Sequence, residues 1–106
     1  MLVHLGRPDC LGKKCRMTSI DGRRVEPTIE GVIFLEQSSG DHKKLICLQK
    51  LRFEDKHVEY RFTYYMEGIK PSRKGHWVFG QYSLTIPMKD LKKLITLARK
   101  AEWPGF

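Results

Sequence analysis

Apolar and polar side chains alternate most regularly between Val58 and Met66, where every second residue is apolar or aromatic. This period of two is that of a β-strand with one face toward a core. Further β-rich stretches occupy 32–35, 44–54 and 76–86, and clusters of turn-forming residues separate them. The pattern therefore predicts four consecutive strands that pair in an antiparallel sheet.

Beyond Pro87 the spacing of apolar residues lengthens to three and four, in a stripe formed by Leu91, Leu94, Ile95 and Ala98. Such a stripe is the apolar face of an amphipathic helix. Proline suits the first turn of that helix because the amide it lacks would be unpaired there. The predicted fold class is α+β, a four-stranded antiparallel β-sheet followed by one C-terminal amphipathic helix. A helix placed last must cover one face of the sheet, which leaves the other face to water or a ligand.

The first 26 residues show no sustained period, because their apolar residues are scattered among Gly, Pro, Lys and Arg. Asp21-Gly22 is a pair favoured in two-residue hairpin turns with positive φ. It favours a short ribbon in which 17–20 pairs with 23–26. We therefore divide the chain into an N-terminal arm or short hairpin, residues 1–26, and a ββββα domain, residues 27–106.

The charge balance narrows the class of partner. With 20 Lys+Arg against 12 Asp+Glu, the chain has a formal net charge of +8. Such an excess attracts nucleic acid or anionic lipid, although it also serves simple solubility. The sequence contains no apolar run of bilayer length and no signal-like N-terminus. We expect no membrane partner and a location in the cytoplasm, or in the nucleus of a eukaryote.

Catalytic and cofactor motifs are missing from the sequence, so we predict a protein that is not an enzyme and needs no cofactor. The three cysteines are unevenly spaced, which favours free thiols. Cys10 and Cys15 form a single ligand pair, whereas structural zinc needs two such pairs, so we predict no metal. An enzyme using Cys10 or Cys15 as a nucleophile is the third-ranked alternative.

Aromatic and basic residues coincide on the strands and on the loop that precedes the last of them. Bases stack on aromatic rings while cations follow the phosphates, which is what binding of single-stranded DNA or RNA requires. The candidate residues are Lys50, Arg52, Arg61, Tyr65, Lys70, Arg73, Lys74, Trp77 and Phe79. Those on the strands alternate away from the more apolar side of each strand, so we expect them to share one face of the sheet. Large exposed aromatic residues also mark protein interfaces. The alternative is therefore a protein-interaction or homo-oligomerisation module that uses the Trp77/Phe79 face.

Four segments between about residues 50 and 100 are similar to one known family. They are Tyr64-Tyr65-Met66, Ile69-Lys70-Pro71-Ser72-Arg73-Lys74-Gly75, Ser83-Leu84-Thr85 and Leu91-Lys92-Lys93-Leu94-Ile95. Together they resemble the transcriptional coactivators called positive cofactor four. The resemblance implies a curved four-stranded sheet with one helix, a homodimer formed through the helices, and sheet channels for single-stranded DNA. It also implies that Arg73 and Lys74 meet phosphates and that Trp77 or Tyr65 stacks on bases.

Overall fold

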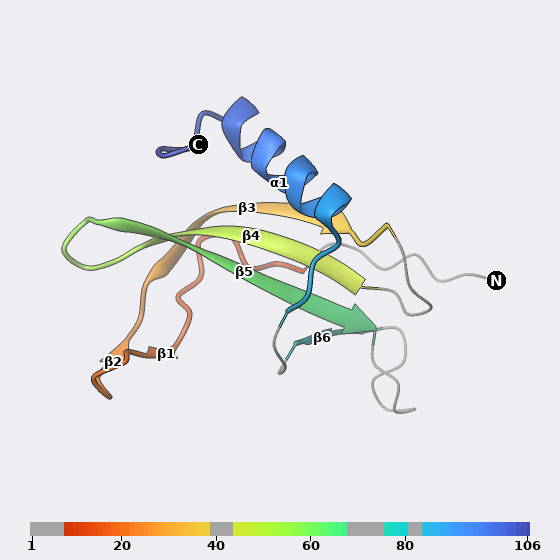
Figure 1. Cartoon of the computed structure of the whole chain (residues 1–106). Coiled ribbons are helices and arrows are strands. Elements are labelled where there is room, and N and C mark those ends of the chain that lie inside the picture. Colours follow the sequence, from red (N-terminus) through yellow and green to blue (C-terminus); the bar gives the residue numbers. More distant parts are fainter. Residues whose placement is uncertain (1–7, 39–43, 68–75, 81–83) are drawn as a thin grey trace.

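A computed structural model describes residues 8–38, 44–67, 76–80 and 84–106 of the chain (Figure 1). Its elements in chain order are β1 (Met17–Thr18), β2 (Arg24–Val25), β3 (Thr28–Glu36), β4 (Lys44–Arg52), β5 (Val58–Glu67), β6 (Trp77–Phe79) and α1 (Met88–Lys100). The last four strands form an antiparallel sheet in the order β3-β4-β5-β6, and β1 and β2 form a separate hairpin. The predicted α+β class is confirmed. Within the described residues, no helix is long and apolar enough to span a bilayer.

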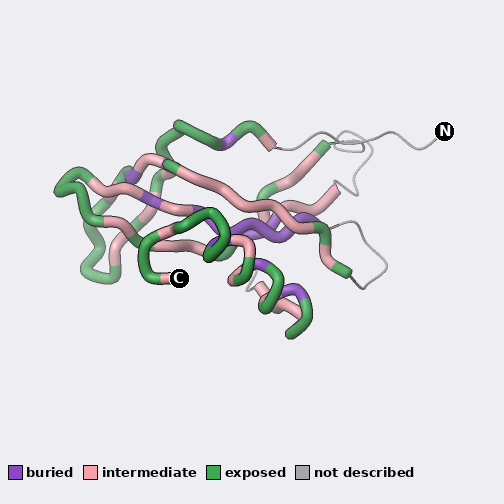
Figure 2. Tube along the Cα trace, turned by 90° about the horizontal axis from the view of Figure 1, so that it is seen from above, coloured by how far each residue is buried: buried purple, intermediate pink, exposed green. Residues whose placement is uncertain are grey.

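Strand β4 contains the most deeply buried run of the sheet (Figure 2). Leu45, Ile46, Cys47 and Leu48 are each at most 1% exposed. This run shows no alternation of apolar and polar residues because both faces of β4 are covered. A strand that is buried on both faces reads as a continuous apolar stretch.

One face of the sheet, the helix face, is covered by α1 (Figure 1). Leu94 and Ala98 are fully buried there against Ile46 and Leu48. Those two members of the predicted apolar stripe are confirmed as core residues, and the other two, Leu91 and Ile95, are half-buried. The helix therefore closes the sheet with the face that its sequence pattern predicts.

The opposite face, the arm face, is not left entirely to solvent. Cys10, Ile29 and Leu51 form a second buried cluster there, with the half-buried Cys15 and Met17 packed against it. Two backbone hydrogen bonds fix the arm to β3, from Gly12 N to Ile29 O and from Ile29 N to Lys13 O. The expectation of one uncovered face is wrong at this end of the sheet, because the second apolar face of β4 needs cover as well.

The predicted N-terminal hairpin forms, with Met17 opposite Val25 and Thr18 opposite Arg24. Its turn differs from the expected two-residue type. Gly22 alone has a positive φ, of 86°, and its N–H donates to the carbonyl of Ser19. A turn closed by such a left-handed glycine is common in three-residue hairpin loops.

Strand β6 is much shorter than the predicted strand over 76–86. It ends at Phe79, and at the next residue, Gly80, a Cβ would lie 2.2 Å from the nearest atom of the Tyr64 ring. The ring thus occupies the space that a side chain at position 80 would need, and glycine in a strand weakens it. Residues 81–83 lie outside the described residues, and Leu84 and Ile86 pack into the core under α1 instead of extending the sheet.

Candidate nucleic-acid interface

The six described candidate residues do not share one face of the sheet, so that part of the sequence prediction is wrong. The register pairs Lys50 with Tyr60 and Gln49 with Arg61, and paired residues share a face. Lys50, and Arg52 two residues further on, therefore lie on the helix face. Arg61, Tyr65, Trp77 and Phe79 lie on the arm face. The remaining candidates, Lys70, Arg73 and Lys74, lie outside the described residues.

The physical reason for this correction is the register of the hairpin between β4 and β5. The alternation of apolar and polar residues shows which residues of one strand share a face. Only the turn decides which residues of the next strand lie on that same face. The apolar face of β5 could be read from its sequence, whereas β4 is apolar on both faces. The faces of the two strands therefore could not be matched from the pattern alone.

Lys50 and Arg52 converge on one carboxylate of the helix face. Arg52 donates from Nε and Nη2 to the two oxygens of Glu30, at 2.6 and 3.2 Å, and the Nζ of Lys50 lies 4.0 Å from Glu30 Oε1. The hydrogen bond from Arg52 lowers the pKa of Glu30 and keeps it ionised. These two cations are therefore engaged within the protein, and we remove them from the candidate interface.

On the arm face a buried glutamine holds Arg61 in place. Gln49 is 0% exposed, and its Oε1 accepts hydrogen bonds from Arg61 Nε at 3.0 Å and from Nη2 at 2.6 Å. The amide nitrogen of Gln49 lies 3.9 Å from the sulfur of Cys10 and donates to it. Sequence reasoning missed Gln49. The available signal was a polar residue inside the apolar run of β4, since a buried amide needs partners.

Arg61 extends from Gln49 over an aromatic ring. Its guanidinium carbon lies 5.5 Å from the centroid of Phe79, and Tyr65 approaches the same ring edge-on, with centroids 5.4 Å apart. Phe79 remains 44% exposed. We call Arg61, Tyr65 and Phe79 the arginine–aromatic cluster. Trp77 is half-buried two residues before Phe79, on the same face of β6.

The cluster combines a partly exposed ring with a fixed positive charge. The guanidinium has five N–H groups, and its Nη1 makes no hydrogen bond with the described residues. Burial raises the pKa of Tyr65 to about 12, so its hydroxyl stays protonated at neutral pH. The arrangement can therefore offer an apolar stacking surface beside donors that suit an anion.

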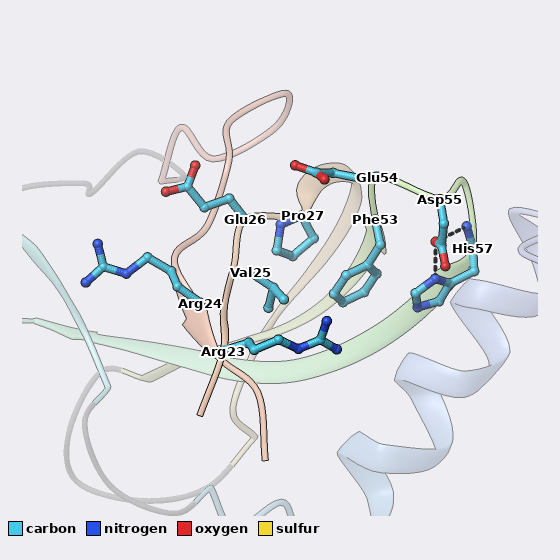
Figure 3. Close-up of a pocket in the computed structure, with 9 residues that line it drawn as sticks. All are labelled: Arg23, Arg24, Val25, Glu26, Pro27, Phe53, Glu54, Asp55 and His57. Atoms are coloured by element: carbon cyan, nitrogen blue, oxygen red, sulfur yellow. Dashed lines mark hydrogen bonds and ion pairs between the residues drawn. The ribbon is translucent and has the colours of Figure 1, made fainter. Parts of the chain in front are cut away.

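A groove of about 460 Å³ opens between β2 and the β4–β5 turn (Figure 3). Phe53 and His57 stack there, with centroids 4.5 Å apart, while the Arg24 side chain points away from them. Both ring nitrogens of His57 meet carboxylates, Nδ1 that of Asp55 and Nε2 that of Glu59 at 2.7 Å. His57 is therefore paired on both sides, and neither of its ring nitrogens is left as an unpaired acid or base in the groove.

The cysteines are free thiols, with Cys10 and Cys47 buried and Cys15 half-buried. The burial of Cys47 in β4 places it in the core. In the part of the chain that the structure describes, no group of three or more His, Cys, Asp or Glu side chains is arranged to hold a metal ion.

Comparison of the chain with protein-family models, curated proteins and solved structures finds no match. The resemblance of residues 50–100 to the positive cofactor four family therefore stays a prediction.

Proposed function

We propose that the protein binds single-stranded nucleic acid through the arginine–aromatic cluster on the arm face, and that it acts by binding rather than by catalysis. One observation supports this most directly. The Arg61 guanidinium, held by the buried Gln49, lies 5.5 Å from the centroid of the partly exposed Phe79 ring.

The chemistry of a single strand fits this arrangement. A base has a flat apolar face that can stack on an exposed ring, and each nucleotide carries one phosphate for a nearby cation. Stacking on an aromatic side chain contributes about 1 to 3 kcal/mol per base and tolerates any base identity. The net charge of +8 adds long-range attraction for a polyanion.

Two phenylalanines of similar exposure on opposite faces of the sheet provide a matched test. Phe79 is 44% exposed on the arm face, and Phe62 is 40% exposed on the helix face. Binding of a fluorescent oligothymidine should be followed by anisotropy at several salt concentrations. We expect Phe79→Ala to weaken binding by about 1 to 3 kcal/mol without changing the salt dependence. Phe62→Ala should bind as the wild type does.

Trp77 is a further candidate for base stacking because it lies on the same face as Phe79. Trp77→Ala should also weaken binding by about 1 to 3 kcal/mol. Equal losses in the Phe62 and Phe79 variants would contradict the proposal, since they would reflect general destabilisation rather than a site.

A protein interface is the second candidate function, because Phe79 is exposed on β6, which ends the described sheet. In this reading the same face forms a homodimer or holds a protein partner. Sedimentation velocity of the wild type and Phe79→Ala separates the two functions. An interface is favoured if the variant loses dimer mass but binds the oligonucleotide normally.

A further inference from the structure

The hairpin of β1 and β2 carries an apolar residue at its tip. The hairpin projects from the sheet on the side away from α1 (Figure 1). Ile20 has a relative exposure of 107%, so its side chain contacts essentially nothing in the protein. At the base of the hairpin, Met17 packs against the buried cluster of Cys10, Ile29 and Leu51. The hairpin is therefore anchored at one end and presents isoleucine at the other.

Hydrogen bonds within the turn fix the position of Ile20. Ser19 N donates to Arg23 O at 2.7 Å, and Gly22 N donates to Ser19 O at 2.9 Å. The carboxylate of Asp21 accepts from the backbone N–H of Arg23 at 3.1 Å and from its Nε at 2.7 Å. A preorganised apolar tip loses little conformational entropy when it inserts into a partner.

The charge around this tip indicates the kind of partner. The segment from Lys13 to Val25 contains five cations and one carboxylate. Arg16 and Arg23 are ion-paired with Glu26 and Asp21, although their side chains are 82% and 78% exposed. Arg24 forms no ion pair with the described residues. An apolar tip flanked by arginines on a narrow β-ribbon matches proteins that wedge an apolar side chain between base pairs while cations hold the phosphates.

We propose that the β1–β2 hairpin is a second nucleic-acid contact, which binds duplex and inserts Ile20 between neighbouring base pairs. Arg24 contacts a phosphate that flanks the opened step. This contact goes beyond the single-strand site proposed above and uses none of its residues. It would let one molecule hold a single strand on the sheet and a duplex at the hairpin.

The test uses the full chain and a short duplex in which 2-aminopurine replaces adenine at a central TA step, a step that unstacks easily. The fluorescence of 2-aminopurine rises when the base loses its stacking neighbours. We expect saturating wild-type protein to raise it and Ile20→Ala to leave it near the free-duplex value. Ile20→Ala should also weaken duplex binding by roughly tenfold, the order expected when burial of an apolar side chain is lost.

Two variants serve as controls. Leu11→Ala removes another exposed apolar side chain, 58% exposed and on the arm rather than the hairpin, and should behave as the wild type. Arg24→Gln should flatten the log-log salt dependence of duplex binding by about 0.9 while the fluorescence still rises at saturation. The Ile20 substitution does not threaten folding, because that side chain is fully exposed.

Either of two results would contradict the proposed insertion of Ile20 between base pairs. One is that wild-type protein leaves the fluorescence unchanged, and the other is that Ile20→Ala raises it as the wild type does. The oligothymidine measurement keeps the two proposals apart, because Ile20→Ala should bind the single strand normally. If Phe79→Ala binds the single strand normally while Ile20→Ala loses the duplex signal, the hairpin contact is supported and the single-strand site on the sheet is not.

Discussion

Gln49 accepts two hydrogen bonds from Arg61 across the β4–β5 pair, and Gln49 itself is 0% exposed. The glutamine therefore orients the cation of the arginine–aromatic cluster from beneath the surface. An uncharged acceptor holds Arg61 without neutralising it, in contrast to the carboxylate of Glu30 that pairs with Arg52.

The first prediction concerns this buried amide. Gln49→Leu keeps the approximate shape of the side chain but leaves Arg61 without its acceptor. Because hydrogen bonds to charged groups contribute about 1.5 to 3 kcal/mol, we expect the free energy of unfolding in urea to fall by about that amount. Affinity for the oligonucleotide should fall as well, since Arg61 is no longer fixed over Phe79. A variant as stable as the wild type would show that these hydrogen bonds contribute nothing net.

The second prediction compares two arginines on opposite faces of the sheet. Arg61→Gln should weaken oligonucleotide binding and flatten its log-log salt dependence by about 0.7, the value for one phosphate contact with a single strand. Arg52→Gln should change neither quantity, because Arg52 lies on the helix face and is paired with Glu30. Circular dichroism should first establish that both variants are folded. Matching losses in the two variants would indicate attraction by net charge alone.

The third prediction concerns the closing helix. Leu94 is 0% exposed, so Leu94→Ala should lower the free energy of unfolding by about 2 to 5 kcal/mol through lost burial and a residual cavity. Lys93→Ala, at the exposed neighbouring position, should change it by less than about 0.5 kcal/mol. If urea unfolding gives similar values for both variants, the helix does not cover the sheet.

The fourth prediction uses two turns that share one geometry. The turns are residues 19–23 and 53–57, and in each the fourth residue has a positive φ, which is 86° for Gly22 and 76° for Lys56. Only glycine adopts this conformation without a steric cost. Lys56→Gly should therefore raise the free energy of unfolding by roughly 0.5 to 1 kcal/mol, and Gly22→Ala should lower it by about 1 kcal/mol. In thermal unfolding, the two variants should change the free energy of unfolding in opposite directions. Changes in the same direction would contradict the prediction.

The fifth prediction concerns pH. The hydrogen bond to Glu59, and then that to Asp55, raises the pKa of His57 above its ordinary value of 6.5. A raised folded-state pKa means that the stabilisation is complete below pH 6.5 and is lost as pH rises through the higher folded value. An NMR titration should give a His57 midpoint above 6.5, and Glu59→Gln should lower that midpoint. A wild-type midpoint at or below 6.5 would show that the ion pairs do not form in solution.

The local pattern of the sequence determined the elements of the fold and their order. Period-two alternation located β5, the three-and-four spacing located α1, and Asp21-Gly22 located the tip of the hairpin. These signals are local because a strand or helix that buries one face must repeat its apolar residues at the period of its own backbone. Residues 81–83, part of the predicted fourth strand, lie outside the described residues.

Only the tertiary structure decided which side chains meet. The pairing of Gln49 with Arg61 sends Lys50 and Arg52 to the helix face, and a shift of one residue would have reversed that outcome. Likewise, the Tyr64 ring lies where a side chain at Gly80 would be, and the arm covers the second apolar face of β4. Register and the cover of each face depend on contacts between distant residues, because the energy of packing belongs to pairs of segments rather than to either segment alone.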